Sequence, residues 1–171
     1  MYVSWVAAWQ TATRVDTFNW QNEIMLTQGQ WPFDLALHAS FIRPRDAAEG
    51  NMLELGPVLQ TEVGRLQINA NVFFDRPLAP PVPRRTELKY QWQLRWHAQR
   101  ALQWGVQGFG ELGPWDHWLP GHKQSHRAGP ALFARLSDSA PQGLQVQAAY
   151  LVGSIYGRRG SMFSMRALWA F

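Results

Sequence analysis

The alternation of apolar and polar residues over residues 87–112 predicts a hairpin of two long β-strands. Every second residue from Leu88 to Trp96 is apolar, and the residues between them are polar or charged. The alternation resumes at Leu102, after a turn around Gln99 and Arg100. Because successive side chains of a strand point to opposite faces, one face of this hairpin is apolar and aromatic and the other is polar.

The same two-residue period recurs along the chain and predicts ten strands. They cover residues 3–9, 18–26, 33–41, 53–62, 66–75, 87–97, 102–112, 127–136, 144–152 and 163–171. Nearly all have about 9–12 residues, close to the length with which a tilted strand spans a bilayer. Strands of soluble proteins are mostly shorter, at about 5–6 residues.

The predicted connections alternate in length. Those after the second, fourth, sixth and eighth strands are short, and those after the third, fifth, seventh and ninth are longer, including residues 113–125 and residues 153–160. Short turns at one end and longer loops at the other are typical of transmembrane β-barrels, and closing the sheet removes its unpaired edges. We therefore predict an all-β fold, a transmembrane up-and-down antiparallel β-barrel of about ten strands that forms a single domain over residues 1–171.

Two Gly-Pro pairs, Gly56-Pro57 and Gly129-Pro130, interrupt predicted strands. Proline cannot donate a hydrogen bond to the ladder, and strand prolines are found mainly at edges and bulges. We expect a β-bulge near the outer rim at each pair.

The composition supports a membrane barrel over a soluble one. The 171 residues include ten tryptophans and no cysteine, which excludes disulfides and thiolate metal sites. A soluble barrel usually carries lysine and glutamate outside, whereas the polar face here is rich in glutamine, asparagine and glycine. We expect the aromatic residues of the apolar face to form a membrane aromatic belt. They are Trp5, Trp9, Trp20, Tyr90, Trp92, Trp96, Trp104 and Trp169.

Charged residues of the polar face divide by sign along the chain. The second to fifth predicted strands supply an acidic wall of Glu23, Asp34, Glu54, Glu62 and Asp75. The later strands supply a basic wall of Lys89, Arg95, Arg127, Arg135 and Arg166, with Glu111 as the exception. Closing the sheet sets the two walls across a lumen. Two interpretations stay open: ion pairs that fill a narrow lumen, or a transverse field across a small water-filled pore.

The longer loops are rich in arginine, which binds phosphate groups through two hydrogen bonds. We expect a basic rim that lies among lipopolysaccharide headgroups, with ordinary solvated loop charge as the alternative. Its residues are Arg43, Arg45, Arg84, Arg85, Arg158 and Arg159. Nucleic acid is not an expected partner, because the aromatic and the basic residues lie on different surfaces.

Two sets of residues are candidates for chemistry. His38 and Ser40, with Asn51 further on, resemble the His-x-Ser pair of outer-membrane phospholipase A and a lipid A deacylase, but the alternation puts both side chains in the lumen rather than at the lipid.

Histidines and an aspartate also cluster around the longest loop, in a spacing that fits no standard metal motif. They are Asp116, His117, His122 and His126. Asp75 and the Asp116-His117 pair would lie near the rim, where omptin proteases keep their catalytic residues. We expect no enzyme activity, no metal and no cofactor.

Three segments carry a family resemblance: residues 53–64 (LELGPVLQTEVG), 104–113 (WGVQGFGELG) and 125–133 (SHRAGPALF). They resemble a poorly characterised group of proteobacterial outer-membrane barrels, which are porin-like proteins of the type named for copper or phenol pathways. The resemblance covers residues 17–171 and implies an outer-membrane location and a barrel fold, but no reaction. Members carry a further hairpin before the first strand, so the resemblance also allows this chain to be the last ten strands of twelve.

The end of the chain resembles the signal that the barrel-insertion machinery recognises, with Trp169 and Phe171 as its aromatic residues. Arg166 stands where this signal usually has glycine. The expected partners are outer-membrane lipid, lipopolysaccharide, the insertion machinery and a small solute, while the oligomeric state is not specified. We predict a porin-like channel for small solutes. The alternatives are a structural barrel with a plugged lumen, alone or in an envelope assembly, and a lipid-active enzyme.

Overall fold

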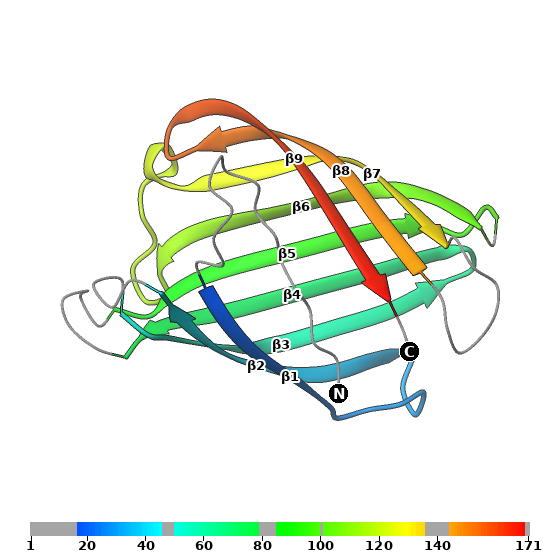
Figure 1. The fold of residues 1–171 in the computed structure, drawn as a ribbon, viewed down its shortest axis with the longest axis horizontal. Coiled ribbons are helices and arrows are strands. Elements are labelled where there is room, and N and C mark those ends of the chain that lie inside the picture. The colour runs from blue at the N-terminus through cyan, green and yellow to red at the C-terminus, as the bar shows by residue number, and fades with distance from the viewer. Residues whose placement is uncertain (1–16, 46–49, 79–84, 100, 136–143, 170–171) are drawn as a thin grey trace.

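The computed structural model describes residues 17–45, 50–78, 85–99, 101–135 and 144–169, which form one antiparallel sheet (Figure 1). Its nine strands lie in sequence order, so the connectivity is up-and-down. They are β1 (Thr17–Met25), β2 (Phe33–Pro44), β3 (Met52–Val63), β4 (Leu66–Pro77), β5 (Glu87–Trp96), β6 (Leu102–Pro114), β7 (Ser125–Arg135), β8 (Leu144–Ile155) and β9 (Arg158–Trp169). The prediction of an all-β, up-and-down antiparallel fold is confirmed. The strand predicted over residues 3–9 lies outside the described residues.

Helix is confined, in the described part of the chain, to the short 3-10 helix η2 (Gly121–Lys123) between β6 and β7. None of the described residues form a helix that is long and apolar enough to cross a membrane. The two-residue period of the sequence therefore determines nearly all of the regular structure, since it favours strands over helices throughout.

The connections define two ends of the sheet. We call the end with the β2–β3, β4–β5, β6–β7 and β8–β9 connections the loop end, and the opposite end the turn end. The prediction of a loop over residues 153–160 is wrong, because only Tyr156 and Gly157 separate β8 from β9. Both have positive φ, 47° and 82°, as the tight hairpin turn with two left-handed residues requires. The predicted alternation of short and long connections therefore fails at this hairpin.

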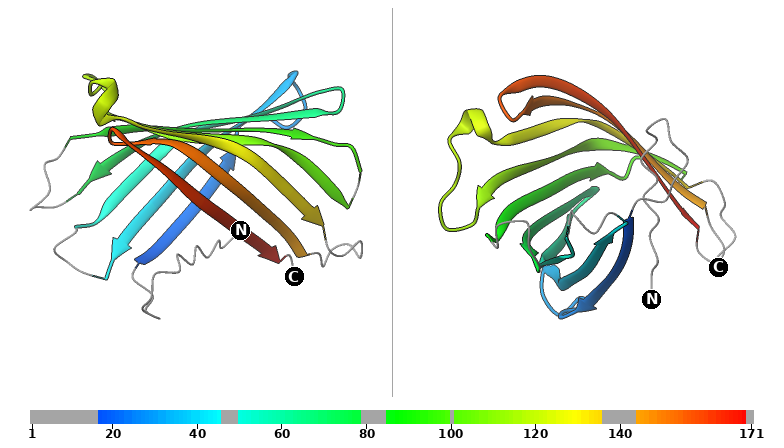
Figure 2. Two further views of the ribbon diagram at one scale, coloured as in Figure 1. Left: turned by 90° about the horizontal axis from the view of Figure 1, so that it is seen from above. Right: turned by 60° about the vertical axis from the view of Figure 1, so that its left-hand side comes forward.

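The sheet is strongly curved, so that it has a concave and a convex face (Figure 2). Burial alternates along the strands in phase with this curvature. On β2, Ala36, His38 and Ser40 are buried. Leu37, which lies between Ala36 and His38, is 39% exposed. On β4, Phe73 and Asp75 are buried while the side chain of Val72 is exposed. Most polar side chains thus lie on the concave face, together with a few buried apolar ones such as Phe73, and the exposed apolar side chains lie on the convex face, the reverse of a soluble fold.

Buried apolar residues form only a small cluster on β7 and β8. Ala131, Phe133, Ala149 and Leu151 are its buried members, and Phe109 and Met162 pack against them. Much more apolar surface lies exposed, with tryptophans, leucines and valines of most strands among the exposed side chains. The described sheet therefore buries only a small part of the apolar surface that its side chains carry.

The two Gly-Pro pairs interrupt the ladder without shifting it. Leu55 pairs with Phe74 and Val58 with Asn71, which is the same register on both sides of Gly56-Pro57. The β7–β8 ladder has the same kind of gap at Gly129-Pro130. The predicted bulges near the outer rim are therefore wrong, because no residue is inserted and the gaps lie inside the strands.

A register shift occurs elsewhere, between β5 and β6. Leu88 pairs with Gly113 but Lys89 pairs with Glu111, so Leu112 is the extra residue. Gly113 has φ 87°, a left-handed conformation that favours glycine. This irregularity lies near the loop end and increases the local twist of the hairpin on which the sequence pattern is clearest.

The glycine of each Gly-Pro pair allows neighbouring strands to approach closely. A Cβ atom at Gly56 would lie 1.8 Å from the backbone oxygen of Val72, and one at Gly129 would lie 2.0 Å from that of Tyr150. Both glycines are on the concave face, where curvature crowds the positions of adjacent strands. We infer that glycine is required at both positions for the sheet to curve as it does.

We therefore expect Gly56→Ala to lower the free energy of unfolding by about 1–3 kcal/mol, the usual cost of overpacking. Chemical unfolding of the refolded protein, followed by tryptophan fluorescence, measures this change. Gly121→Ala is the matched control, since a Cβ atom there meets nothing within 4 Å. Equal stability of the two variants would contradict this account of the curvature.

Candidate functional site

The concave face is the candidate functional site, and it has two halves of different character. Paired charges cross it near the loop end, from β2 to β7. Glutamine and arginine side chains predominate in the half nearer the turn end, where they line a pocket. The strand alternation brings these groups together because every second residue of each strand faces the concavity.

Ion pairs in the loop half join neighbouring strands. Lys89 Nζ on β5 contacts the Asp75 carboxylate on β4, whose side chain is only 3% exposed. His38 Nε2 on β2 lies 3.0 Å from Glu54 Oε1 on β3. Arg127 Nη2 on β7 lies 3.9 Å from Glu111 Oε1 on β6.

This pairing changes the picture of two opposed walls. Asp75 and Lys89, from the predicted acidic and basic walls, meet directly because β4 and β5 are neighbours. Arg127 is paired with Glu111, the acidic residue that did not fit the basic wall. The charges of the loop half are therefore largely compensated within the sheet.

The remaining predicted acidic residues are more dispersed. Glu23, with a side chain 48% exposed, lies 3.8 Å from His38 Nδ1. Asp34 accepts a 2.7 Å hydrogen bond from the Gly29 backbone in the β1–β2 connection, so its carboxylate stabilises that turn. Glu62 lies at the turn end and lines the pocket.

His38 and Ser40 are both on the concave face, as the alternation predicts. Gln21 Nε2 donates to His38 Nδ1 at 3.4 Å, and this leaves Nε2 of His38 to donate to Glu54. Ser40 is 1% exposed and donates a 2.5 Å hydrogen bond to Asn19 Oδ1. No hydrogen bond joins His38 to Ser40 within the described residues, so this geometry lacks an activated serine.

A chain of side-chain hydrogen bonds follows the turn half across four strands. Gln67 Nε2 donates to Asn69 Oδ1, Asn69 Nδ2 to Gln93 Oε1, and Gln93 Nε2 to Gln107 Oε1, each at 3.2 Å. Gln147 Nε2 on β8 then donates to Gln107 on β6 at 2.5 Å. Because β7 lies between β6 and β8 in the sheet, this last bond crosses the inner side of β7.

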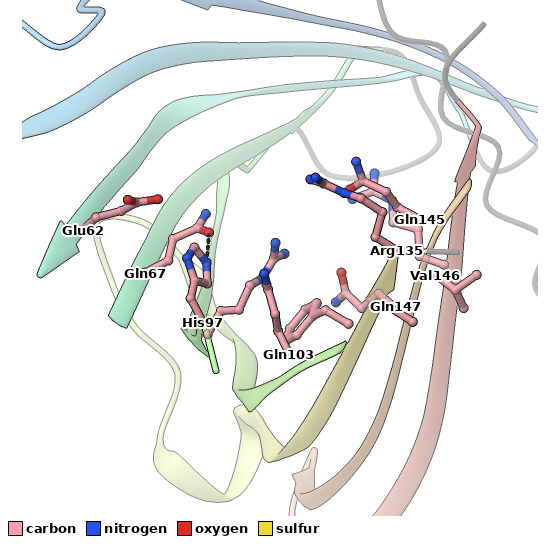
Figure 3. A pocket seen from close by; sticks show the side chains of 12 residues that line it. Glu62, Gln67, His97, Gln103, Arg135, Gln145, Val146 and Gln147 are labelled. Carbon is pink, nitrogen blue, oxygen red and sulfur yellow. Dashed lines mark hydrogen bonds between the residues drawn. The ribbon is translucent and has the colours of Figure 1, made fainter. Parts of the chain in front are cut away.

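The turn-end pocket lies beside this chain and has a volume of about 420 Å³. Gln67 and His97 point into it from one wall, and Arg135, Gln145 and Gln147 from the other (Figure 3). Three guanidinium groups and one carboxylate are among the charged groups that line it. They belong to Arg95, Arg135, Arg166 and Glu62. The pocket therefore carries a positive excess.

Aromatic rings on the concave face hold cationic groups in place. The Arg95 guanidinium lies 4.1 Å from the centre of the Phe133 ring, and that of Arg127 lies 4.3 Å from the Phe109 ring. Such contacts are favourable because the ring face is electronegative. Sequence reasoning did not single out Phe109 as a lumen residue. Its place between two glycines on the polar face is the signal that could have found it.

The predicted basic rim lies at the loop end as far as it is described. Arg43 lies near the end of β2 and Arg45 follows that strand, while Arg85 precedes β5 and Arg158 and Arg159 begin β9. All five side chains are exposed. Arg84 lies outside the described residues. The rim and the turn-end pocket are thus at opposite ends of the sheet.

The predicted aromatic belt lies on the convex face where it is described. Trp20, Trp96 and Trp104 are 51%, 40% and 57% exposed. Tyr90 and Trp92 are half-buried because their rings lie over glycines of β6, where an added Cβ would come within 2.7 Å of them. Trp5, Trp9 and Phe171 lie outside the described residues, and for Trp169 only its place in β9 is described.

The candidate metal ligands near the β6–β7 connection do not converge. No group of three histidine, aspartate or glutamate side chains in the described part of the chain is placed to hold a metal ion. His126 instead bonds the Tyr90 hydroxyl at 2.7 Å and Gln124 Oε1 at 2.7 Å, and Gln124 donates to the Leu119 backbone. These contacts tie the connection to the convex face of β5.

The β8–β9 turn contacts β6 at the loop end, on the concave side of the sheet. The Tyr156 hydroxyl donates a hydrogen bond to Glu111. This bond to a carboxylate raises the pKa of Tyr156, because ionising the phenol would remove the donor and place two negative charges together.

No protein-family model, no curated protein and no solved structure matches this chain in the three comparisons. The proposals below therefore depend on the geometry and chemistry of the described residues.

Proposed function

We propose that this protein is a transmembrane β-barrel of the bacterial outer membrane and acts as a porin-like channel for small solutes. The observation that carries the proposal is the inverted sheet, with apolar side chains on its convex face and polar or charged ones on its concave face. Such a surface is favourable when lipid surrounds the convex face, and very unfavourable when water does.

The distribution of aromatic residues supports the membrane location. Many exposed aromatic side chains lie toward the turn end (Trp31, Trp96 and Trp104) or toward the loop end (Phe18, Trp115, Trp118 and Tyr156), whereas Tyr150 and Phe163 lie near the middle of β8 and β9. Exposed aliphatic side chains lie between them along the strands, including Leu37, Leu55 and Val72. Two aromatic girdles that flank an aliphatic band are typical of a barrel wall in a bilayer.

Closure follows from the same physical requirement. A nine-stranded sheet leaves β1 and β9 as edges, and unpaired backbone groups are not tolerated in hydrocarbon. We propose that the sheet closes into a barrel of about ten strands.

In the proposed orientation of the barrel in the outer membrane, the loop end faces the outside of the cell. Five exposed arginines of the rim lie there, where they would contact lipopolysaccharide phosphates through charge-assisted hydrogen bonds. The turn-end pocket then opens toward the periplasm. The barrel-insertion machinery is the proposed partner during assembly.

A channel predicts discrete single-channel conductance. Purified full-length protein, refolded in detergent and added to a planar lipid bilayer, is expected to give uniform current steps. We expect the step size to change when the charge of Arg95 or Arg135 is removed by glutamine, because both residues line the turn-end pocket. Refolded protein that inserts into vesicles yet gives no current would rule out the channel.

A structural barrel with a plugged lumen is the second candidate, and a specific observation favours it. The bond from Gln147 to Gln107 passes over β7 on the concave side and so occupies space inside the curve of the sheet. Together with the ion pairs of the loop half, it would narrow or close a lumen. Membrane insertion without conductance, with a protein partner recovered by crosslinking, is the result that this candidate predicts.

A further inference from the structure

The turn-end pocket concentrates positive charge that the sheet does not compensate. No ion pair joins Arg95, Arg135 or Arg166 to a carboxylate of the described residues. In the loop half, by contrast, Lys89 and Arg127 each have an acidic partner. We propose that the turn-end pocket is a binding site for a small oxyanion, a phosphate or a carboxylate, which supplies the missing negative charge.

Arg95 is the fixed member of the site. Its guanidinium carbon lies over the Phe133 ring, 4.1 Å from the ring centre, and Nη2 donates a 3.1 Å hydrogen bond to Gln93 Oε1. Because Arg95 lines the pocket, its guanidinium charge attracts an anion that binds there.

Arg135 and Arg166 are the adaptable members, since both side chains are exposed. They come from the ends of β7 and β9 and line the same pocket as Arg95. Like charges that share a cavity repel one another, and a bound anion converts this repulsion into attraction. Glu62 is the single carboxylate of the lining, and it comes from β3.

The lining also defines the class of ligand. Guanidinium groups present planar pairs of donors that match the oxygen atoms of carboxylate and phosphate. Gln103, Gln145 and Gln147 add amide groups that donate further hydrogen bonds. A volume of about 420 Å³ suits a small molecule and not a macromolecular segment. Inorganic phosphate and small dicarboxylates are therefore the probes of choice.

This inference deepens the proposed function only in one respect: in a conducting barrel the site makes the passage prefer anions. Binding itself requires the pocket and not conductance. The two proposals can therefore fail separately, and the experiment has two parts.

The first part is calorimetric titration of the refolded full-length protein with sodium phosphate and, separately, with sodium succinate. We expect saturable binding of at least one of them. Arg135→Gln and Arg166→Gln should each weaken it roughly fivefold, the factor for one unit charge about 4 Å away in water. Arg76→Gln, an exposed arginine of β4 that neither lines the pocket nor belongs to the basic rim, is the matched control and should bind as the parent does.

Absence of saturable binding of both anions, or an equal loss in Arg76→Gln, would overturn the anion site. Phosphate binding without succinate binding, or the reverse, identifies which oxyanion the site prefers. Because Arg135 and Arg166 are exposed and have no ion-pair partner among the described residues, neither variant is expected to prevent folding.

The second part measures the reversal potential of single channels in a gradient of potassium chloride. We expect anion preference, lost in the Arg135→Gln, Arg166→Gln double variant. Anion binding in a protein that conducts no current would remove the channel and keep the site. Current with equal selectivity in parent and double variant, together with absent binding, would remove the site and keep the channel.

Discussion

Lys89→Met is expected to lower the free energy of unfolding by about 3 kcal/mol, near the lower end of the cost of removing one partner of a buried ion pair. The reason is the burial of Asp75, whose side chain is 3% exposed and has Lys89 as its ion-pair partner. Without the ammonium group, the Asp75 carboxylate faces Glu54, which pairs with it across β3 and β4. Unfolding in urea at neutral pH, with the protein in lipid vesicles, measures the loss.

The chain offers a matched control for this change in Lys123, an exposed lysine in the β6–β7 connection. Lys123→Met should change stability by no more than about 0.5 kcal/mol, as surface substitutions usually do. The Asp75→Asn, Lys89→Met double variant should recover most of the loss, since it leaves no unpaired charge. If Lys89→Met is no more destabilising than Lys123→Met, the ion pair does not stabilise the sheet.

Leu37→Arg tests which solvent surrounds the convex face. Leu37 lies near the middle of β2 and is 39% exposed. In lipid, an arginine near the bilayer midplane is expected to destabilise a barrel by about 2–4 kcal/mol. On a face in contact with water the same substitution would cost no more than about 0.5 kcal/mol. Urea unfolding from lipid vesicles separates the two values.

Gln91→Arg is the matched control on the other face. Gln91 is also near the middle of its strand and exposed, but the alternation of β5 places it with Lys89 and Gln93 on the concave face. A lumen position accepts a charge at little cost, so Gln91→Arg should leave stability nearly unchanged. A chain that stays folded and monomeric in water without detergent would contradict the membrane location altogether.

Local pattern was sufficient to predict most of the strands and the two faces. The alternation around Trp92 and Leu94 predicted β5, and the same rule placed Ser40 and Asp75 on the polar face, where they are buried. The rule works because the side chains of a strand alternate whatever its neighbours are. It fails at Tyr156-Gly157, because a two-residue turn depends on backbone conformation that the alternation does not encode.

Charge pairing could not be predicted in the same way. Which carboxylate meets Lys89 depends on the register between β4 and β5 and on the shift at Leu88, which no single strand contains. The acidic and basic residues were correctly placed on one face as a set, but their partners depend on the two-dimensional ladder. The ion pairs of the loop half are therefore a finding of the structure.

The sequence by itself determined how hydrophobic and polar positions alternate along each strand. This alternation predicted the all-β, up-and-down sheet and the polarity of each face. Only the tertiary structure decided that neighbouring strands approach closely at Gly56 and Gly129, that Gln147 reaches Gln107 across β7, and that three arginines share one pocket. The physical reason is range. Side-chain alternation is a property of adjacent residues, whereas curvature and register bring together side chains from strands that are distant along the chain.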